Sequence, residues 1–126
     1  MFKRIDHVEI VPGDMDRSID FYTNVLGFKV KERRKVERPP LQEIAYITLN
    51  DSMVELLSYA DPLPPSSEPR QIRYRMMAIE VEDMDKAVEY LKTKGVELSL
   101  GPVALGSSIR AEIKDPDGLS IELRQW

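Results

Sequence analysis

The chain carries the same short pattern twice, and this repeat constrains its fold more than any other feature. The order aspartate, methionine, aspartate opens an amphipathic segment at Met15 and another at Met84, 69 residues later. A constant offset of this kind predicts a duplicated structural unit. Applied to the segment before each opening, the same offset aligns His7 with Met76. One copy therefore has an imidazole where the other has a thioether.

Length and composition narrow the class of protein. A chain of 126 residues fits one domain, and each half is too small to bury a good core comfortably alone. We therefore expect the halves to pack together or to pair with another chain. The net charge of −4 gives no reason to expect nucleic-acid binding, and the lack of cysteine excludes disulfides, thiolate metal sites and a cysteine nucleophile. No apolar run reaches the length of a membrane span or signal peptide. We expect a soluble, cytoplasmic protein.

Hydrophobic periodicity and turn residues predict the element order β-α-β-β-β in both halves. In the first half we expect a helix over residues 15–26 and strands over residues 5–11, 28–36, 43–49 and 53–58. In the second half we expect a helix over residues 84–94 and strands over residues 73–81, 96–98, 107–113 and 119–124. A proline-rich linker, residues 60–71, separates a first module, residues 1–59, from a second, residues 72–126. The predicted fold class is α+β: a single domain, residues 1–126, of two tandem βαβββ modules forming a curved mixed sheet around a cleft.

The two modules, their helix openings and the closing segment Asp-Pro-Asp-Gly-Leu-Ser-Ile-Glu-Leu at residues 115–123 resemble the vicinal-oxygen-chelate superfamily over essentially the whole chain. That superfamily includes glyoxalases, methylmalonyl-CoA epimerases, extradiol dioxygenases, and fosfomycin- and bleomycin-resistance proteins. In its metal-dependent members the ligands come from the first and last strands of each module. The resemblance implies metal ligands at His7, Glu55 and Glu122, and Met76 stands where the pattern would place a further histidine.

The strand phases support a shared site independently of the resemblance. Alternation places His7, Glu9, Glu55 and Glu122 on the faces opposite the apolar ones, and curled sheets would bring them to one concavity. Carboxylates in a partly desolvated cleft repel one another unless a cation or protons intervene. One imidazole and two carboxylates suit a divalent ion such as nickel, zinc, cobalt or manganese. We expect Glu9 to face solvent or support a ligand, and Met76, a poor ligand in such a setting, to line the cavity wall.

Simpler interpretations of the same residues remain open. A lone histidine on a strand is commonly a surface or hydrogen-bonded residue, and either glutamate could be an exposed strand residue. The basic residues between positions 29 and 35 are typical of a solvated edge strand protected from aggregation. Helical spacing predicts that Tyr22 and Tyr90 belong to the core.

Two classes of function follow. The first is a metal-dependent lyase or isomerase of glyoxalase type, acting on a small substrate chelated through two adjacent oxygens, with Glu122 first and Glu55 second as the group that moves the proton. An epimerase of methylmalonyl-CoA type shares this logic, whereas an extradiol dioxygenase needs two histidines and the chain has one. The second class is a metal-free small-molecule binding or resistance-type protein, which Met76 supports. In either case we expect a homodimer, because open curved sheets leave edges and apolar faces to cover.

Overall fold

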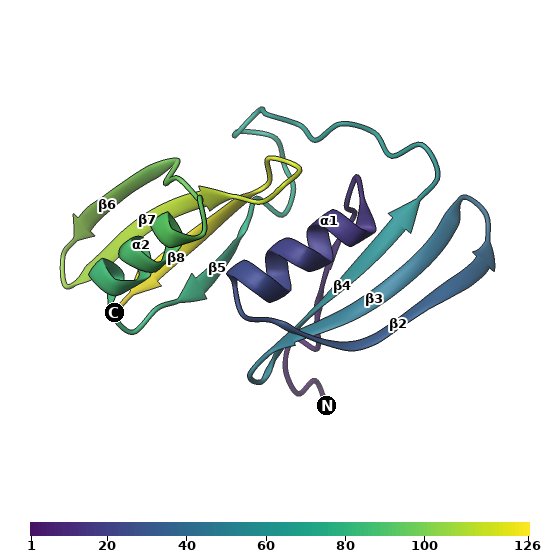
Figure 1. The fold of residues 1–126 in the computed structure, drawn as a ribbon, viewed down its shortest axis with the longest axis horizontal. Coiled ribbons are helices and arrows are strands. Elements are labelled where there is room, and N and C mark those ends of the chain that lie inside the picture. The colour runs from purple at the N-terminus through teal and green to yellow at the C-terminus, as the bar shows by residue number, and fades with distance from the viewer. The chain divides into compact units, whose positions relative to one another are not determined.

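The computed structural model describes residues 1–126 and contains the predicted element order twice (Figure 1). The first module consists of β1 (Val8–Ile10), α1 (Met15–Asp20) with its π-helical continuation η1 (Phe21–Val25), β2 (Lys29–Arg38), β3 (Leu41–Leu49) and β4 (Ser52–Tyr59). The second module consists of β5 (Met77–Glu80), α2 (Met84–Thr93), β6 (Leu100–Leu105), β7 (Ser108–Lys114) and β8 (Ser120–Gln125). The predicted α+β class and the two tandem βαβββ modules are confirmed.

Each module has its own four-stranded mixed sheet. The chain divides into two compact units, Met1–Pro64 and Pro65–Trp126, and the division falls inside the proline-rich segment. The strand order is β1-β4-β3-β2 in the first unit and β5-β8-β7-β6 in the second. In both sheets the first and last strands of the module pair in parallel and the other neighbours pair antiparallel. The parallel pairing places residues that are far apart in sequence, such as Glu9 and Glu55, side by side.

Both helices begin where the repeat predicts, and the same capping interaction fixes each start. The carboxylate of Asp14 accepts a hydrogen bond from the Arg17 amide at 2.9 Å, and that of Asp83 accepts one from the Lys86 amide at 3.0 Å. An aspartate side chain in this position satisfies an amide that has no partner within the helix. Neither helical segment has the length and the apolar character that a membrane span requires.

The first helix differs from its prediction in its last turns. The expected single α-helix over residues 15–26 is α-helical only to Asp20 and continues as η1. There the hydroxyl of Thr23 donates a hydrogen bond to the carbonyl of Ile19 at 2.6 Å. The fully buried Tyr22 packs edge-on against Phe21 and Phe28, with ring centroids 5.4 and 5.6 Å away. No proline or glycine marks this change, so helical periodicity alone could not predict it.

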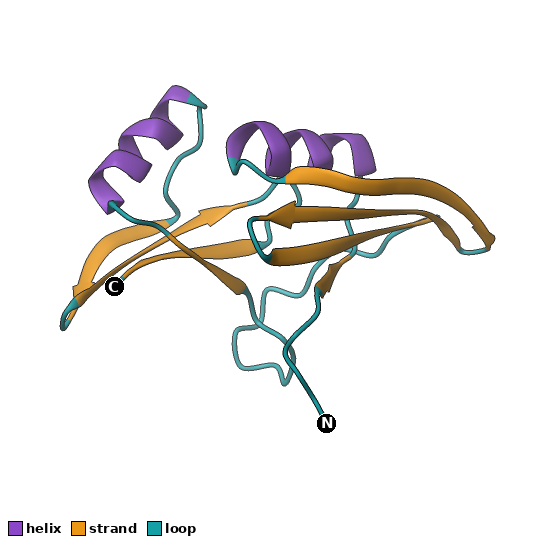
Figure 2. Cartoon of the chain, turned by 90° about the horizontal axis from the view of Figure 1, so that it is seen from below, coloured by secondary structure: helices purple, strands orange, loops and turns teal.

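The core of each unit lies between its helix and one face of its sheet (Figure 2). In the first unit this face carries Ala45, Ile47, Val54 and Leu56, and in the second it carries Ala111, Ile113, Ile121 and Leu123. Because side chains alternate along a strand, Glu55 and Glu122 project from the opposite faces. The prediction that Tyr90 is a core residue is wrong, since it is 45% exposed. The 69-residue offset aligns the fully buried Tyr22 with Leu91, which is buried too.

One strand of the second unit lies elsewhere than predicted. Residues 96–98 form no strand, and β6 runs over Leu100–Leu105 instead. The amide of Val96 still donates to the carbonyl of Leu91 and so closes α2. Pairing with the neighbouring strand begins only when the Ser99 amide reaches the carbonyl of Glu112, at 2.8 Å. The short apolar stretch that suggested a strand therefore serves as the end of the helix.

Candidate metal centre

Three potential metal ligands meet on one face of the first sheet. His7 lies one residue before β1, Glu9 follows two residues later on the same face, and Glu55 is the register neighbour of Glu9 on β4. The imidazole Nε2 of His7 lies 3.1 Å from a carboxylate oxygen of Glu55 and 3.8 Å from one of Glu9. One ligand atom from each residue lies within 4.8 Å of the other two. The structure therefore brings together His7 and Glu55, and adds Glu9, which the sequence analysis had placed outside the ligand set.

The other ring nitrogen of His7 is held by its chain neighbour. His7 Nδ1 lies 2.8 Å from a carboxylate oxygen of Asp6. This hydrogen bond is the largest influence on the imidazole and raises the pKa of His7; partial burial opposes it, and the charges of Glu55 and Glu9 add to it. When Nδ1 donates its proton in the hydrogen bond to Asp6, Nε2 is the ring nitrogen that faces Glu9 and Glu55. Metal-binding histidines are commonly oriented by a carboxylate in this way.

Glu55 is the most buried of the three groups and has a second polar neighbour. The residue is 7% exposed, and Tyr46 lies beside it in register on β3. A hydrogen bond to Glu55, together with partial burial, raises the pKa of Tyr46. The same tyrosine ring meets the imidazole of His7 edge-on, with centroids 5.8 Å apart. Tyr46 thus contacts both His7 and Glu55 and restricts their positions.

The chemistry of this set fits a divalent cation. Glu9 and Glu55 are adjacent like charges on one sheet face, an arrangement that destabilises a sheet unless a cation compensates it. The imidazole of His7 is the basic group that pairs with both. One imidazole nitrogen and carboxylate oxygens suit zinc, nickel, cobalt or manganese. The orientation of His7 by Asp6 supplies the support that such a ligand needs.

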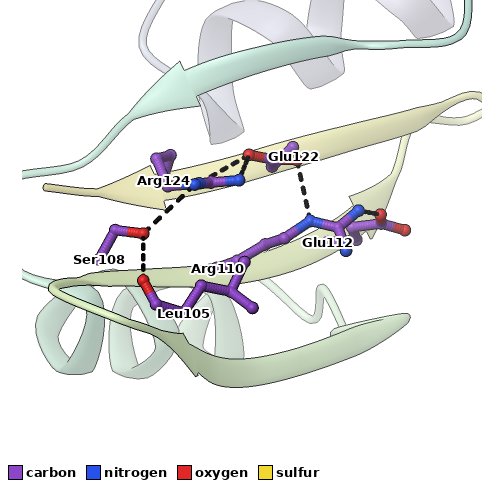
Figure 3. Close-up of polar contacts among 6 residues, drawn as sticks. All are labelled: Leu105, Ser108, Arg110, Glu112, Glu122 and Arg124. Atoms are coloured by element: carbon purple, nitrogen blue, oxygen red, sulfur yellow. Dashed lines mark hydrogen bonds and ion pairs between the residues drawn. The ribbon is translucent and has the colours of Figure 1, made fainter.

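The predicted ligand of the second module, Glu122 on β8, has a different environment (Figure 3). One carboxylate oxygen accepts a hydrogen bond from Arg110 Nε at 2.9 Å, and the other accepts one from Arg124 Nε at 2.8 Å. Arg110 also pairs with Glu112, and Arg124 donates to the hydroxyl of Ser108 at 3.3 Å. Partial burial alone would raise the pKa of Glu122, but the hydrogen bonds from the two arginines outweigh it and hold that pKa below its ordinary value. Glu122 is therefore a well-stabilised carboxylate.

The arginine partners of Glu122 and the roles of Asp6 and Tyr46 were not predicted from the sequence. Spacing offered a signal for the arginines, because Arg110 and Arg124 stand two residues from Glu112 and Glu122 on their strands and so share a face. Asp6 precedes the histidine directly, a contact that strand alternation would not suggest.

Comparison with known proteins agrees with this architecture. The chain matches the model of the Glyoxalase/Bleomycin resistance protein/Dioxygenase superfamily over residues 4–123. The chain belongs to this superfamily. A lactoylglutathione lyase of Arabidopsis thaliana is 34% identical over 98% of this chain, which spans only 44% of that plant protein. A lactoylglutathione lyase of Neisseria meningitidis serogroup A is 32% identical over 97% of this chain and 90% of its own length. The crystal structure of a glyoxalase family protein from Enterococcus faecalis superposes with a TM-score of 0.84 at 25% identity, covering 98% of both chains.

Within the superfamily fold, the two modules of this chain differ at equivalent positions of their sheets. The 69-residue offset aligns His7 with Met76 and Glu9 with Ala78, so the second module lacks both of these donors. A further difference concerns the neighbours of the last-strand glutamates. In the first sheet Leu57 pairs with Ile44, whereas the corresponding pair of the second sheet is Arg124 with Arg110. The glutamate of the first module faces an imidazole and that of the second faces two guanidinium groups.

Proposed function

We propose that the protein is a metal-dependent lyase or isomerase of glyoxalase type, which moves a proton on a small substrate bearing two adjacent oxygens. Superfamily membership and relatives named lactoylglutathione lyase support the reaction class. The observation that carries the proposal is the orientation of the His7 imidazole. Its Nδ1 is hydrogen-bonded to the Asp6 carboxylate, and its Nε2 points toward the carboxylate of Glu55. A histidine oriented this way, next to a buried carboxylate, is suited to hold a cation.

The metal ligands in this proposal are His7, Glu55 and Glu122, and the ion is nickel, zinc, cobalt or manganese. Such an ion would act as a Lewis acid toward the substrate oxygens and so acidify the adjacent C–H bond. Asp6 keeps the proton on Nδ1 and leaves Nε2 free as a ligand atom. Tyr46 holds Glu55 through its hydroxyl group and limits the positions that the carboxylate can take.

A carboxylate would carry the proton between neighbouring carbons of the substrate. The sequence offers Glu122 and Glu55 for this role. The two arginines hold the pKa of Glu122 below its ordinary value, which makes this carboxylate a poor general base. Glu55 is buried, lies on a central strand of its sheet and accepts the Tyr46 hydrogen bond. We therefore propose that Glu55 accepts the proton from one carbon and returns it to the next, with Glu122 mainly a charged ligand.

A turnover assay with defined metals tests this proposal. Purified chain, stripped with a chelator and reloaded with one metal at a time, is given methylglyoxal and glutathione, and S-lactoylglutathione formation is followed. We expect metal-dependent turnover that Glu55→Gln lowers by at least about a hundredfold, in the range of a lost general base. Glu37→Gln, an exposed glutamate on β2, is the matched control and should keep full activity. Full turnover by a folded Glu55→Gln protein would remove Glu55 from the mechanism.

A second candidate is a metal-free binding protein on the same fold. Met76 at an expected ligand position and the pairing of Glu122 with two arginines favour it. The discriminating measurement is a thermal-shift series with nickel, zinc, cobalt and manganese. Binding of a ligand to the native state alone raises the melting temperature, and His7→Ala should remove that rise if the first proposal holds. The absence of any shift with all four metals would favour the metal-free alternative.

The proposal also includes a homodimer in the cytoplasm, as expected from the sequence. Sedimentation analysis at micromolar concentration measures the first point, and a monomer there would contradict it.

A further inference from the structure

We infer that Glu9 is an additional metal ligand, so that the first module alone supplies three donors: the imidazole of His7 and the carboxylates of Glu9 and Glu55. This inference rests on the proposed function, since it concerns the same ion. It adds a residue that the sequence pattern of the metal-dependent members does not point to.

The backbone geometry places Glu9 where a ligand is needed. Glu9 lies two residues after His7, so both side chains leave the same face of the chain, and it is the register neighbour of Glu55 across the parallel β1–β4 pair. A carboxylate oxygen of Glu9 lies 3.8 Å from His7 Nε2, on the side where Glu55 approaches to 3.1 Å. The Glu9 side chain is 60% exposed, so it has the freedom to turn and close on an ion entering from solvent.

The local charge balance supports the same assignment. Two carboxylates in adjacent register positions repel each other. The only basic side chain that pairs with either is His7, which Asp6 also contacts at 2.8 Å. With a singly charged imidazolium, the cluster of His7, Glu9 and Glu55 keeps a net negative charge. A divalent ion would compensate the charges of both Glu9 and Glu55. The cluster therefore favours a doubly charged cation over a proton.

The second module lacks the donors that surround the glutamate of the first. The residues equivalent to His7 and Glu9 are Met76 and Ala78, and Ala78 is the register neighbour of Glu122. A thioether is a poor ligand for a divalent ion in an oxygen-rich setting, and alanine offers no donor at all. Each oxygen of Glu122 already accepts a guanidinium hydrogen bond. The donors that His7 and Glu9 supply beside Glu55 therefore have no counterpart beside Glu122.

The test measures metal binding by the full chain without reference to turnover. Chelator-treated wild type, Glu9→Gln and the control Glu37→Gln are titrated with cobalt(II) and zinc(II), by calorimetry for affinity and by visible absorption for cobalt coordination. We expect Glu9→Gln to weaken binding at least about tenfold and to change the cobalt spectrum, because a ligand is lost. Glu37→Gln should match wild type in both readouts. A melting curve of each metal-free variant confirms that it is folded, as expected for a substitution at an exposed side chain.

The outcomes separate this inference from the proposed function. Weaker binding together with an altered spectrum supports Glu9 as a ligand. If Glu9 only attracted the ion through its charge, Glu9→Gln would weaken binding in a salt-dependent way and leave the cobalt spectrum unchanged. That result would overturn the inference. Unaltered affinity in Glu9→Gln, with binding lost in His7→Ala, also overturns it while the proposed function stands. No binding by wild type removes both.

Discussion

The hydrogen bond between Asp6 and His7 makes the titration of the imidazole a sensitive test of the site. Asp6→Asn keeps the size of the side chain and removes its charge. Because this hydrogen bond is the largest cause of the raised pKa of His7, we expect the variant's imidazole to titrate at lower pH than that of wild type. His7 is the only histidine in the chain, so a single imidazole signal reports the change.

The sign of the effect on stability follows from linkage. The pKa of His7 in the folded chain lies above its ordinary value of 6.5, so its protonation stabilises the metal-free fold at low pH. This contribution is fully present below pH 6.5 and is lost as the pH rises through the folded pKa. In Asp6→Asn the contribution should be smaller and should vanish over a lower pH range. Urea unfolding of the metal-free chain at several pH values measures it.

Metal binding should respond in the opposite sense to pH. A proton on Nε2 excludes the metal, so below the folded pKa the affinity should fall by about tenfold per pH unit. Above that pKa, loss of the supporting carboxylate in Asp6→Asn should weaken binding by about 10–100-fold. Asp51→Asn, an exposed turn residue, is the matched control. Proton NMR titration of the imidazole, paired with calorimetry, provides both numbers. An unchanged imidazole midpoint in Asp6→Asn would refute the assigned role of Asp6.

Two further predictions concern the fold and the second module. Leu56→Ala, at a fully buried position of β4, should lower the free energy of unfolding by about 2–5 kcal/mol in urea titration, whereas Leu63→Ala at an 89% exposed position should have little effect. Arg124→Gln removes one of the two guanidinium groups that contact Glu122, so the pKa of Glu122 should rise. On acidification, the stability that the charged carboxylate provides should therefore be lost at a higher pH than in wild type. Carbon-detected NMR of the glutamate carboxyl follows this pKa, and an unchanged value would show that Arg110 alone sets it.

The repeat made the fold predictable, because local signals and the tertiary arrangement agree in this chain. Aspartate caps fix the starts of both helices, and strand alternation places Val54 and Leu56, or Ile121 and Leu123, in the core. One assignment failed because it rested on helical spacing and did not use the offset of the repeat. Tyr90 was assigned to the core but is 45% exposed, whereas the 69-residue offset from the fully buried Tyr22 points to Leu91, which is buried.

The site was only partly predictable for a related reason. The sequence identified His7, Glu55 and Glu122 as members of one family pattern, but neighbours across a sheet depend on register, which a single strand does not reveal. Register places Glu9 beside Glu55 and Arg110 beside Arg124. These pairings distinguish the two modules chemically, and neither could be read from the spacing of residues along one strand.

Coordination of the metal by Nε2 of His7 is the central claim about this site. Nitrogen-15 NMR of the single imidazole measures this coordination directly. On titration of the metal-free chain with zinc at pH 7.5, the Nε2 resonance should move to a metal-bound position at one equivalent. Nδ1 should meanwhile stay protonated against Asp6. Both nitrogens unchanged at saturating zinc and at saturating nickel would contradict the account.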